Sequence, residues 1–303
     1  MVDARIKRKA VLILRGLLVV NEFLASNKFN EIHNWLLEAA KKNKIPMELR
    51  TNAELLIDIS SDQKEKLTDF VLFWDKDVKL ASFLEKLGYP VFNNSKAIEI
   101  CDDKALTHLS LMNTDIPMPR TIIAPKTFDN IGYTNYDFLT ETAKLLRFPM
   151  VIKECFGSFG QQVYLVHNLE EARERMRSIG TRPVLFQEFL QTSFGRDLRL
   201  QVVGKKVIAG MYRYSENGDF RANLSIGGKM QPYEPTIRQK ELAIRCCEAI
   251  GLDFAGVDLL FGEGDEPIVC EVNSNAHFKN IFDCTGVNAA EAIMEHILCK
   301  LQG

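Results

Sequence analysis

Apolar positions recur at two different intervals along the first third of this chain, and each interval predicts a kind of element. Short apolar runs at residues 11–20 and 69–74 predict strands. Apolar residues spaced three and four apart predict amphipathic helices over residues 31–42 and 78–87. Strands that alternate with helices are typical of a small parallel α/β domain, which we place at residues 1–100.

Beyond residue 100 the pattern predicts two further units, at residues 101–185 and 186–303. It becomes mostly β after Pro149, and it contains no internal repeat. The predicted helices cover residues 102–113, 138–146, 237–250 and 288–300. One predicted strand begins at residue 121, and the others cover residues 150–153, 162–166, 184–189, 197–203 and 206–213.

Two aliphatic segments flank turn-forming residues 262–267 and predict a β-hairpin. If the hairpin folds symmetrically about Gly264 and Asp265, Asp258 faces Glu271, and Asn273 shares their face. Facing carboxylates repel each other, and a divalent cation would reverse that effect. Because Asp, Glu and Asn offer only oxygens, the expected ion is magnesium. A solvated acidic hairpin is the plainer alternative, but the aliphatic neighbours and the basic residues upstream favour a metal site.

Upstream of the hairpin lies a strand, a glycine-bearing loop and a second strand. Lys153 precedes the loop that contains Gly157 and Gly160. Glycines let backbone amides approach phosphate oxygens, and a lysine on the preceding strand reaches the same phosphates. Taken alone, such a loop is more often purely structural.

Polar and basic side chains follow on the next strands. Gln187, Glu188 and Phe189 end an apolar strand, where backbone groups could read an adenine edge. Arginine suits phosphate because its planar fork binds two oxygens at once. For any one of these residues a buried strand or a surface salt bridge is the plainer alternative, and only their accumulation favours a site. The charged and amide residues in question are Asp197, Arg199, Arg213, Arg221 and Asn223.

In this order, the segments resemble the ATP-grasp carboxylate–amine ligases, and most closely the RimK-type amino-acid ligases. The similarity covers roughly residues 100–300, and the set of motifs is specific although no single motif is. The resemblance implies an ATP-grasp fold of the α/β (α+β) class, with residues 1–100 as the preceding domain. The matching pieces are Val151-Ile152-Lys153, Gln187-Glu188-Phe189, Gly195-Arg196-Asp197-Leu198-Arg199, Gly218-Asp219-Phe220-Arg221-Ala222-Asn223-Leu224, Ala255-Gly256-Val257-Asp258 and Glu271-Val272-Asn273.

The resemblance also implies roles for these residues. ATP phosphates would contact Lys104 and Lys153, under a closing loop that contains Gly157, Ser158 and Gly160. The adenine and ribose would lie at the strand end, and one or two magnesium ions, which manganese could replace, would lie at the hairpin. The nucleotide site would be completed by Gln187, Glu188, Phe189, Asp197, Arg199, Arg221 and Asn223, and the metal site by Asp258, Glu271 and Asn273.

The implied reaction begins when a carboxylate attacks the γ-phosphate of ATP. Magnesium and the lysine and arginine residues would neutralise the two anions, and Arg221 is one of these groups. An amine then attacks the acylphosphate and gives an amide, ADP and phosphate. Arg213 is the candidate for stabilising the oxyanion at the acyl carbon, and closure of the glycine loop would keep water away.

One stretch departs from the RimK pattern. The residues after Asn273 are Ser274-Asn275-Ala276-His277-Phe278-Lys279-Asn280, which are more like those of ligases that act on amino-group-carrier proteins. This departure puts glutamylation of a protein tail in doubt. His277 could be a base for the amine and Lys279 could pair with a substrate carboxylate. An ordinary hydrogen-bonded loop histidine is an equal alternative, and the histidines at 33, 108, 167 and 296 receive no role.

Composition narrows the class of protein. The chain has 303 residues, 46% hydrophobic and 26% charged, with a net charge of −2. This balance is typical of a globular protein and gives no electrostatic case for nucleic acid or an anionic membrane. The basic tract 5–9 reads as a solvated arm. The apolar run after it resembles a signal peptide superficially, but Arg15 interrupts it and no cleavage site follows. No segment has the length needed to span a bilayer.

The seven cysteines, at 101, 155, 246, 247, 270, 284 and 299, include no Cys-x-x-Cys pair. They predict small core residues in a reducing compartment, the cytoplasm, rather than disulfides or zinc ligands.

The sequence therefore predicts an ATP-dependent, magnesium-requiring ligase that joins a carboxylate to an amine of an amino acid, peptide or protein tail. A nucleotide-binding regulator that has lost catalysis is the alternative from another class, although an intact set of metal ligands argues against it. A dehydrogenase is disfavoured because the Gly-x-Gly-x-x-Gly fingerprint is missing. The identity of the acid and the oligomeric state stay open, although related ligases often form dimers or tetramers.

Overall fold

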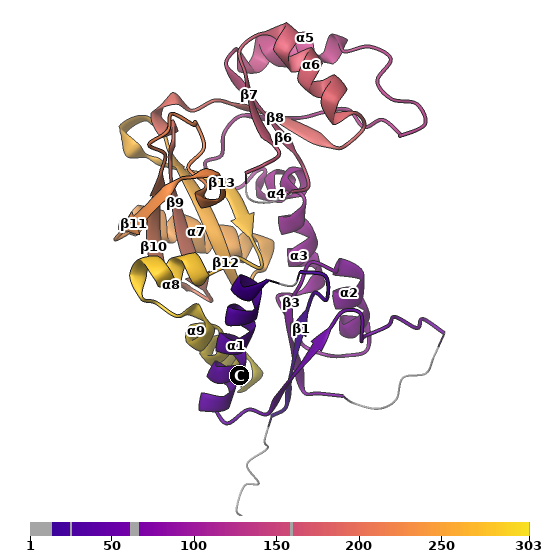
Figure 1. The fold of residues 1–303 in the computed structure, drawn as a ribbon, viewed down its shortest axis with the longest axis vertical. Coiled ribbons are helices and arrows are strands. Elements are labelled where there is room, and N and C mark those ends of the chain that lie inside the picture. The colour runs from indigo at the N-terminus through magenta and orange to yellow at the C-terminus, as the bar shows by residue number, and fades with distance from the viewer. Residues whose placement is uncertain (1–13, 25, 61–66, 158–159, 303) are drawn as a thin grey trace, which may run out of the picture.

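The computed structural model describes residues 14–24, 26–60, 67–157 and 160–302, and its elements are arranged around three sheets (Figure 1). The basic tract 5–9, the start of the first apolar run and Ser158 of the glycine loop lie outside these ranges. Within them, the predicted mixed α/β architecture is confirmed.

The first sheet, sheet A, is parallel throughout, as the alternation of strands and helices predicts. Its strand order is β2-β1-β3-β4. The edge strand β2 was not predicted, because its sequence MELRT is half-exposed and carries little apolar pattern. The elements of this unit are β1 (Gly16–Val20), α1 (Asn27–Lys42), β2 (Met47–Thr51), β3 (Phe70–Trp74), α2 (Val78–Lys86) and β4 (Val91–Phe92).

Two helices connect this unit to the rest, where the sequence predicts a single helix over residues 102–113. The predicted helix is confirmed as α4 (Lys104–Leu111), whereas α3 (Ser95–Asp102), which comes directly before it, was not predicted. The Asp103 carboxylate accepts hydrogen bonds from the amides of Ala105 and Leu106, so it caps α4 and breaks the run.

Sheet B forms a separate upper lobe with its own apolar core (Figure 1). Its strand order is β5-β8-β6-β7, and its neighbouring strands are antiparallel. Helix α6 was missed, because only Ala172, Met176 and Ile179 of its residues are buried. The elements are β5 (Thr121–Ile123), α5 (Asp137–Leu146), β6 (Met150–Glu154), β7 (Val163–Val166), α6 (Leu169–Ile179) and β8 (Val184–Glu188).

Sheet C is the five-stranded antiparallel sheet that carries most of the predicted site, with strand order β11-β10-β9-β12-β13. Strand β11 and helix α8 were not predicted. The boundary predicted between residues 185 and 186 falls inside strand β8 of sheet B. The division into these two units therefore stays a prediction. The elements are η1 (Gln191–Ser193), β9 (Arg196–Val203), β10 (Lys206–Tyr214), η2 (Leu224–Ile226), β11 (Lys229–Pro232), α7 (Ile237–Ile250), β12 (Phe254–Phe261), η3 (Glu263–Asp265), β13 (Pro267–Asn273), α8 (Lys279–Thr285) and α9 (Ala289–Gln302).

The β12–β13 hairpin pairs Asp258 with Glu271, as predicted, but for a different reason. Near the turn, Leu259 pairs with Val269 instead of Cys270, so the pairing there is shifted by one residue relative to the symmetrical hairpin. Cys270 is the extra residue of a β-bulge between these two pairs, and it restores the predicted register.

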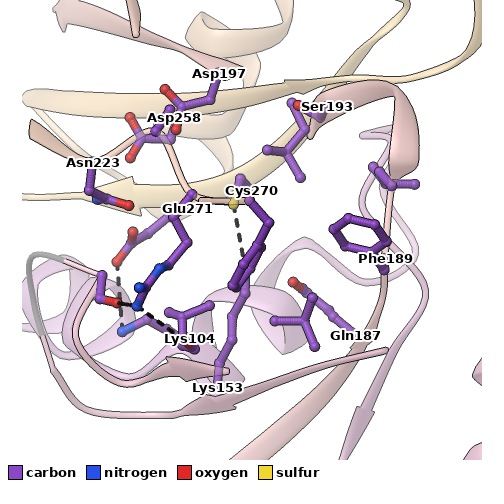
Figure 2. Close-up of a pocket in the computed structure, with 18 of the residues that line it drawn as sticks. Lys104, Lys153, Gln187, Phe189, Ser193, Asp197, Asn223, Asp258, Cys270 and Glu271 are labelled. Atoms are coloured by element: carbon purple, nitrogen blue, oxygen red, sulfur yellow. Dashed lines mark hydrogen bonds and ion pairs between the residues drawn. The ribbon is translucent and has the colours of Figure 1, made fainter. Parts of the chain in front are cut away.

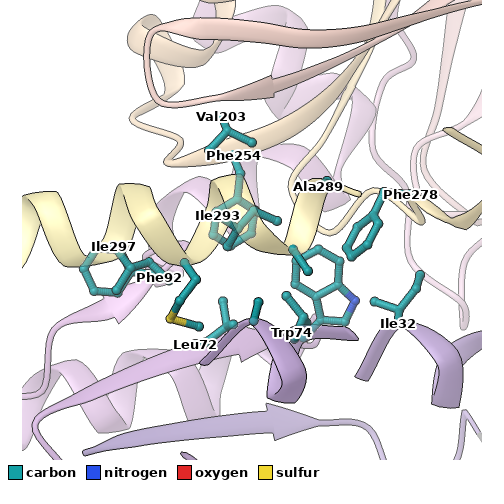
Figure 3. Packing of buried hydrophobic residues seen from close by; sticks show 14 of the residues in the cluster. Ile32, Leu72, Trp74, Phe92, Val203, Phe254, Phe278, Ala289, Ile293 and Ile297 are labelled. Carbon is teal, nitrogen blue, oxygen red and sulfur yellow. The ribbon is translucent and has the colours of Figure 1, made fainter. Parts of the chain in front are cut away.

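Sheet A and sheet C share one apolar core, which joins the N-terminal unit to the C-terminal helices. Figure 3 shows Trp74, from the end of β3, beside Phe254 and Phe278. The ring centroids of Trp74 lie 5.5 Å from those of both phenylalanines. Helices α1 and α9 pack across this junction, so the two units are held in a fixed relation.

Asn93 joins the same two units by hydrogen bonds and is completely buried. Its amide nitrogen donates to the carbonyl oxygens of Phe254 and Ser274, both at 2.9 Å. Its side-chain oxygen accepts from the amides of Asp253 and Phe254. One side chain therefore satisfies four backbone groups that would otherwise be buried without partners.

We expect Asn93→Ala to lower the free energy of unfolding by about 2–4 kcal/mol, because it leaves those backbone groups unsatisfied. Urea denaturation would measure the change. The control is Asn34→Ala on the exposed face of α1, which should stay within about 0.5 kcal/mol of the original protein. A similar stability for both variants would contradict this role of Asn93.

Candidate functional site

A row of alternating charges crosses one face of sheet C. Arg213 on β10 pairs in register with Asp197 on β9, and Arg199 on β9 pairs with Asp258 on β12. Glu271 on β13 continues the row beside Asp258. Because residues paired across antiparallel strands point to one face, the strand register itself brings these five groups together.

Two arginines hold Asp258. Arg199 binds both of its oxygens, with Nη2 at 2.7 Å from Oδ2, and Arg213 Nη2 lies 3.2 Å from Oδ2. Arg213 also binds Asp197 through two bonds of 2.6 and 2.8 Å. Burial alone would raise the pKa of Asp258, but the two guanidinium groups outweigh it and lower that pKa. The carboxylate thus stays ionised, as a metal ligand must be.

The predicted repulsion between Asp258 and Glu271 is relieved by side chains. Glu271 leans toward Lys104, whose Nζ lies 3.7 Å from its carboxylate (Figure 2). Asp258 instead pairs with Arg199 and Arg213. The facing carboxylates alone therefore do not require a metal ion.

Lys153 on β6 is buried and aims into the cleft between sheets B and C. Its one recorded partner is the Cys270 sulfur, 3.5 Å from Nζ, and the described residues contain no carboxylate in ion-pair contact with it. A buried ammonium group whose charge is so weakly compensated attracts an anion strongly. The β-bulge turns Cys270 and Glu271 into the same cleft, so Cys270 is a cleft residue that the sequence did not indicate.

The glycine loop is held against the cleft by two of the predicted phosphate ligands. Lys104 Nζ donates to the Gly157 carbonyl oxygen at 3.0 Å, and Arg221 Nη1 donates to that of Gly160 at 2.7 Å. Asp219 fixes the Arg221 side chain through Nε and Nη2. Gly157 and Gly160, the two glycines of the loop, are thus held by cations that also face the site.

The far end of the cleft is apolar and contains a histidine with no role assigned from the sequence. Phe189 lies edge-on to Phe194 and Phe220. His108 Nε2 lies 2.8 Å from the Gln187 side-chain amide, and its Nδ1 lies 3.3 Å from the Met118 sulfur.

The Glu188 carboxylate accepts a hydrogen bond of 2.7 Å from the Arg120 amide. This contact engages one of the two oxygens that were expected to face a ribose.

The structure brings most of the predicted residues to one cleft (Figure 2). Asp197 and Asp258 line one wall, and Lys104 and Lys153 line the opposite wall. The predicted residues in its lining are Lys104, Lys153, Gly157, Gly160, Gln187, Glu188, Phe189, Asp197, Arg213, Arg221, Asn223, Asp258 and Glu271.

A second cavity, of about 680 Å³, lies between sheet A and sheet C. It contains the remaining predicted site residues that the structure describes, Arg199 and Asn273. Arg213, Asn223 and Glu271 line both cavities, so the two spaces adjoin at these residues.

His277 and Lys279, the two candidate residues beyond Asn273, lie in different surroundings. His277 lines the second cavity, lies edge-on to Phe29, and its Nε2 is buried without a recorded partner. Burial, with the charge of Lys28, lowers the pKa of His277 and keeps it neutral. Lys279 instead pairs with Glu31 at 3.2 Å and Asp283 at 2.8 Å, outside the cavity lining, so it is not held ready for a substrate carboxylate.

The residues fit a divalent metal in their chemistry. Asp258, Glu271 and Asn273 provide carboxylate and amide oxygens, and the Asn273 side-chain nitrogen is buried without a recorded partner. Across the described part of the chain, no cluster of three His, Cys, Asp or Glu side chains could hold an ion. A magnesium site here thus depends on the asparagine and on Asp258 leaving its arginine partners.

The comparison with known families agrees with this geometry. The RimK-like ATP-grasp domain matches residues 101–297, which is about two thirds of the chain. The chain belongs to the RimK-like ATP-grasp family. It is thus an ATP-grasp ligase, an ATP-dependent enzyme that joins a carboxylate to an amine. Members of this family use ATP and divalent metal ions.

Two relatives of this ATP-grasp ligase show how far the similarity reaches. It is 36% identical over 217 residues to the probable alpha-L-glutamate ligase of Xanthomonas euvesicatoria, covering 71% of this chain and 70% of the relative. It is 34% identical over 230 residues to the human N-acetylaspartylglutamate synthase A, covering 75% of this chain and 57% of the synthase. The chain thus spans little more than half the length of the human synthase.

The fold of this ATP-grasp ligase is also that of solved structures. The RimK domain protein of Sphaerobacter thermophilus superposes with a TM-score of 0.70 at 21% identity, over 93% of this chain and 98% of the other. This likeness concerns the fold alone and confirms the predicted ATP-grasp architecture. Among the helices in the described ranges, none is long and apolar enough to cross a membrane.

We expect Asp258→Asn to lower the free energy of unfolding by about 3–5 kcal/mol, because it leaves buried guanidinium charge uncompensated. The double variant Asp258→Asn/Arg199→Gln restores the balance of charge and should recover at least about half of that loss. Urea denaturation without ATP or metal would measure both. Equal losses in the single and double variants would contradict the charge-balance explanation.

We expect His108 to make stability fall in mild acid. Burial, aided by the charge of Lys153, lowers the pKa of His108 to about 4, below its ordinary 6.5. Between these values the unfolded chain binds a proton that the folded protein refuses, so stability falls as pH falls from about 6.5 to about 4.

The loss from pH 7 to pH 5 should therefore be about 2 kcal/mol larger in the original protein than in His108→Gln. Urea denaturation at both pH values would measure it. The exposed control His167→Gln should keep the original pH dependence, and an unchanged dependence in His108→Gln would contradict the prediction.

Proposed function

We propose that this ligase uses L-glutamate as its amine substrate and joins it to a small carboxylic acid, with magnesium–ATP in the cleft between sheets B and C. The observation that carries the proposal is the junction of two cavities. The cleft of the phosphate-binding candidates adjoins the second cavity at Arg213, Asn223 and Glu271. A phosphoryl group in one space can therefore meet substrates that enter from the other.

In this proposal, the nucleotide lies along the cleft with its base beside Gln187 and Phe189. Lys153 and Lys104 neutralise the phosphates. Lys104 and Arg221 exchange their bonds to the carbonyl oxygens of Gly157 and Gly160 for bonds to phosphate oxygens. The free volume of the cleft is about 120 Å³. Small-molecule sites typically offer roughly 300–1,000 Å³, so the glycine loop must lift to admit ATP. The predicted nucleotide-binding residues also include Asp197, Arg199 and Asn223.

Asp258, Glu271 and Asn273 would hold the metal, one or two ions of magnesium or manganese, which supplies charge neutralisation at the β- and γ-phosphates. The acid's carboxylate oxygen attacks the γ-phosphorus, and ADP leaves. The ammonium group of glutamate loses one proton, its nitrogen attacks the acyl carbon, inorganic phosphate leaves, and the nitrogen releases a second proton. Arg213, deep at the junction, is placed to stabilise the oxyanion of that second step.

Glutamate is proposed for two reasons. The two relatives carry glutamate in their names, as a ligase or as a glutamate conjugate synthase. The second cavity also includes the polar side chains of Lys28 and His277, which suit an acidic amino acid. The volume of about 680 Å³ accommodates two small substrates, so a peptide or protein tail is not required.

Location and assembly belong to the same proposal. All seven cysteines are free, and Cys101, Cys155, Cys246 and Cys247 are buried. This usage supports the cytoplasm as the location. A homo-oligomer stays a prediction that follows from the family resemblance.

The test is ADP release by the full chain with magnesium–ATP, L-glutamate and a panel of di- and tricarboxylic acids, with mass spectrometry of the product. We expect an amide of glutamate with one acid. Asp258→Asn should lower turnover at least about 100-fold, because charge neutralisation at the phosphates is lost. ATP binding without ADP release under all conditions would contradict the proposal and favour the catalytically silent regulator.

A further inference from the structure

Three polar side chains meet at one edge of sheet A. Asn21, Asn52 and Asp75 directly follow β1, β2 and β3, and all three line the second cavity. Because these strands are parallel, their carboxyl ends lie at one edge, where open α/β sheets usually bind ligands. This edge forms the wall of the cavity that faces sheet C.

Asp75 is a buried carboxylate with no cationic partner recorded in the described chain. Its side chain is among the buried charged groups, at 5% exposure. Its oxygens accept bonds from the Asn21 amide at 3.0 and 3.2 Å and from the Lys76 backbone amide at 2.7 Å. The neighbouring Lys76 ammonium group pairs with Asp102 instead, at 2.7 Å. A buried charge without a counter-charge is costly, and an incoming cation would relieve that cost.

The segment after β13 offers an acceptor that has no hydrogen-bond partner. Asn275, two residues beyond Asn273, donates its side-chain amide to the Asp75 carbonyl oxygen. Its own side-chain oxygen is buried without a recorded partner, although it also lines the cavity. The hydrogen bond fixes Asp75 to the segment that follows the predicted metal ligands, so the two acceptors belong to one end of the cavity.

We infer that Asp75, positioned by Asn21 and assisted by the Asn275 oxygen, binds the ammonium group of the amine substrate. The inference rests on the proposed function and adds the subsite at which the amine is recognised. An ammonium group brings one positive charge and three donors, which match a buried carboxylate without a cationic partner and an amide oxygen without a hydrogen-bond partner. The same cavity reaches Arg213 and Glu271, so an amine recognised here shares its space with the reacting groups.

The test compares Asp75→Asn, which keeps the shape and removes the charge, with Glu22→Gln. Glu22 is an exposed carboxylate next to Asn21 and lies outside the cavity lining. Titration of L-glutamate without ATP, followed by calorimetry and by Trp74 fluorescence, measures affinity directly. N-acetyl-L-glutamate, whose nitrogen carries no charge, is the second probe.

We expect Asp75→Asn to weaken L-glutamate binding at least about tenfold, because a charge-assisted bond is lost. Glu22→Gln should bind like the original protein, and N-acetyl-L-glutamate should bind weakly to all three. The melting temperature of Asp75→Asn should be unchanged or higher, since an uncompensated buried charge is removed. A residue with only a structural role would lower it.

Undiminished L-glutamate binding by Asp75→Asn, or equal binding of the acetylated probe to the original protein, would overturn the inference. So would a failure of L-glutamate to bind the original protein. Turnover separates this result from the proposed function. ADP release with an unchanged KM for L-glutamate in Asp75→Asn would refute the ammonium site alone. Binding that depends on Asp75 without ADP release would refute the ligase reaction alone.

Discussion

The row of alternating charges across sheet C is the constraint on which the site depends. Arg213, Asp197, Arg199, Asp258 and Glu271 come from four adjacent strands. The first four are neutralised mainly by one another across the sheet, and Glu271 pairs with Lys104. Burying such charges costs more than burying apolar residues, so the row is poorly explained by stability alone. In the proposed reaction, ATP and metal would exchange with partners that are already in place, so that no charge is left without a counter-charge.

A similar exchange of partners applies to the two cations that contact the glycine loop. Arg221 and Lys104 hold the glycine loop through carbonyl oxygens, which are weaker partners for a cation than phosphate oxygens. A nucleotide bound as proposed would therefore compete with these carbonyl oxygens for the two cations. Sheet B has its own core, whereas sheets A and C share one, so relative motion is easier at the cleft than at the second cavity.

Much of the fold and of the site could be predicted from local pattern. The parallel unit, the hairpin and most strands of sheet C follow from apolar spacing, and the pairing of Asp258 with Glu271 was predicted correctly. That success depends on two features that offset each other, since the pairing near the turn is shifted by one residue and the bulge at Cys270 compensates for the shift. Helices α6 and α8 carry few apolar residues, so pattern alone missed them.

The sequence by itself determined the chemistry at the phosphates, because residues two apart on a strand share a face and the order of motifs is specific to a family. Only the tertiary structure decided what surrounds that chemistry. His108 lies far from Gln187 in the chain, and Asp75 lies two hundred residues before Asn275, yet each pair is in contact. Such contacts arise from packing between sheets, and neither spacing nor composition encodes them. The cavity that we propose for the substrates therefore depends on the fold, whereas the residues proposed to bind phosphate follow from the motifs.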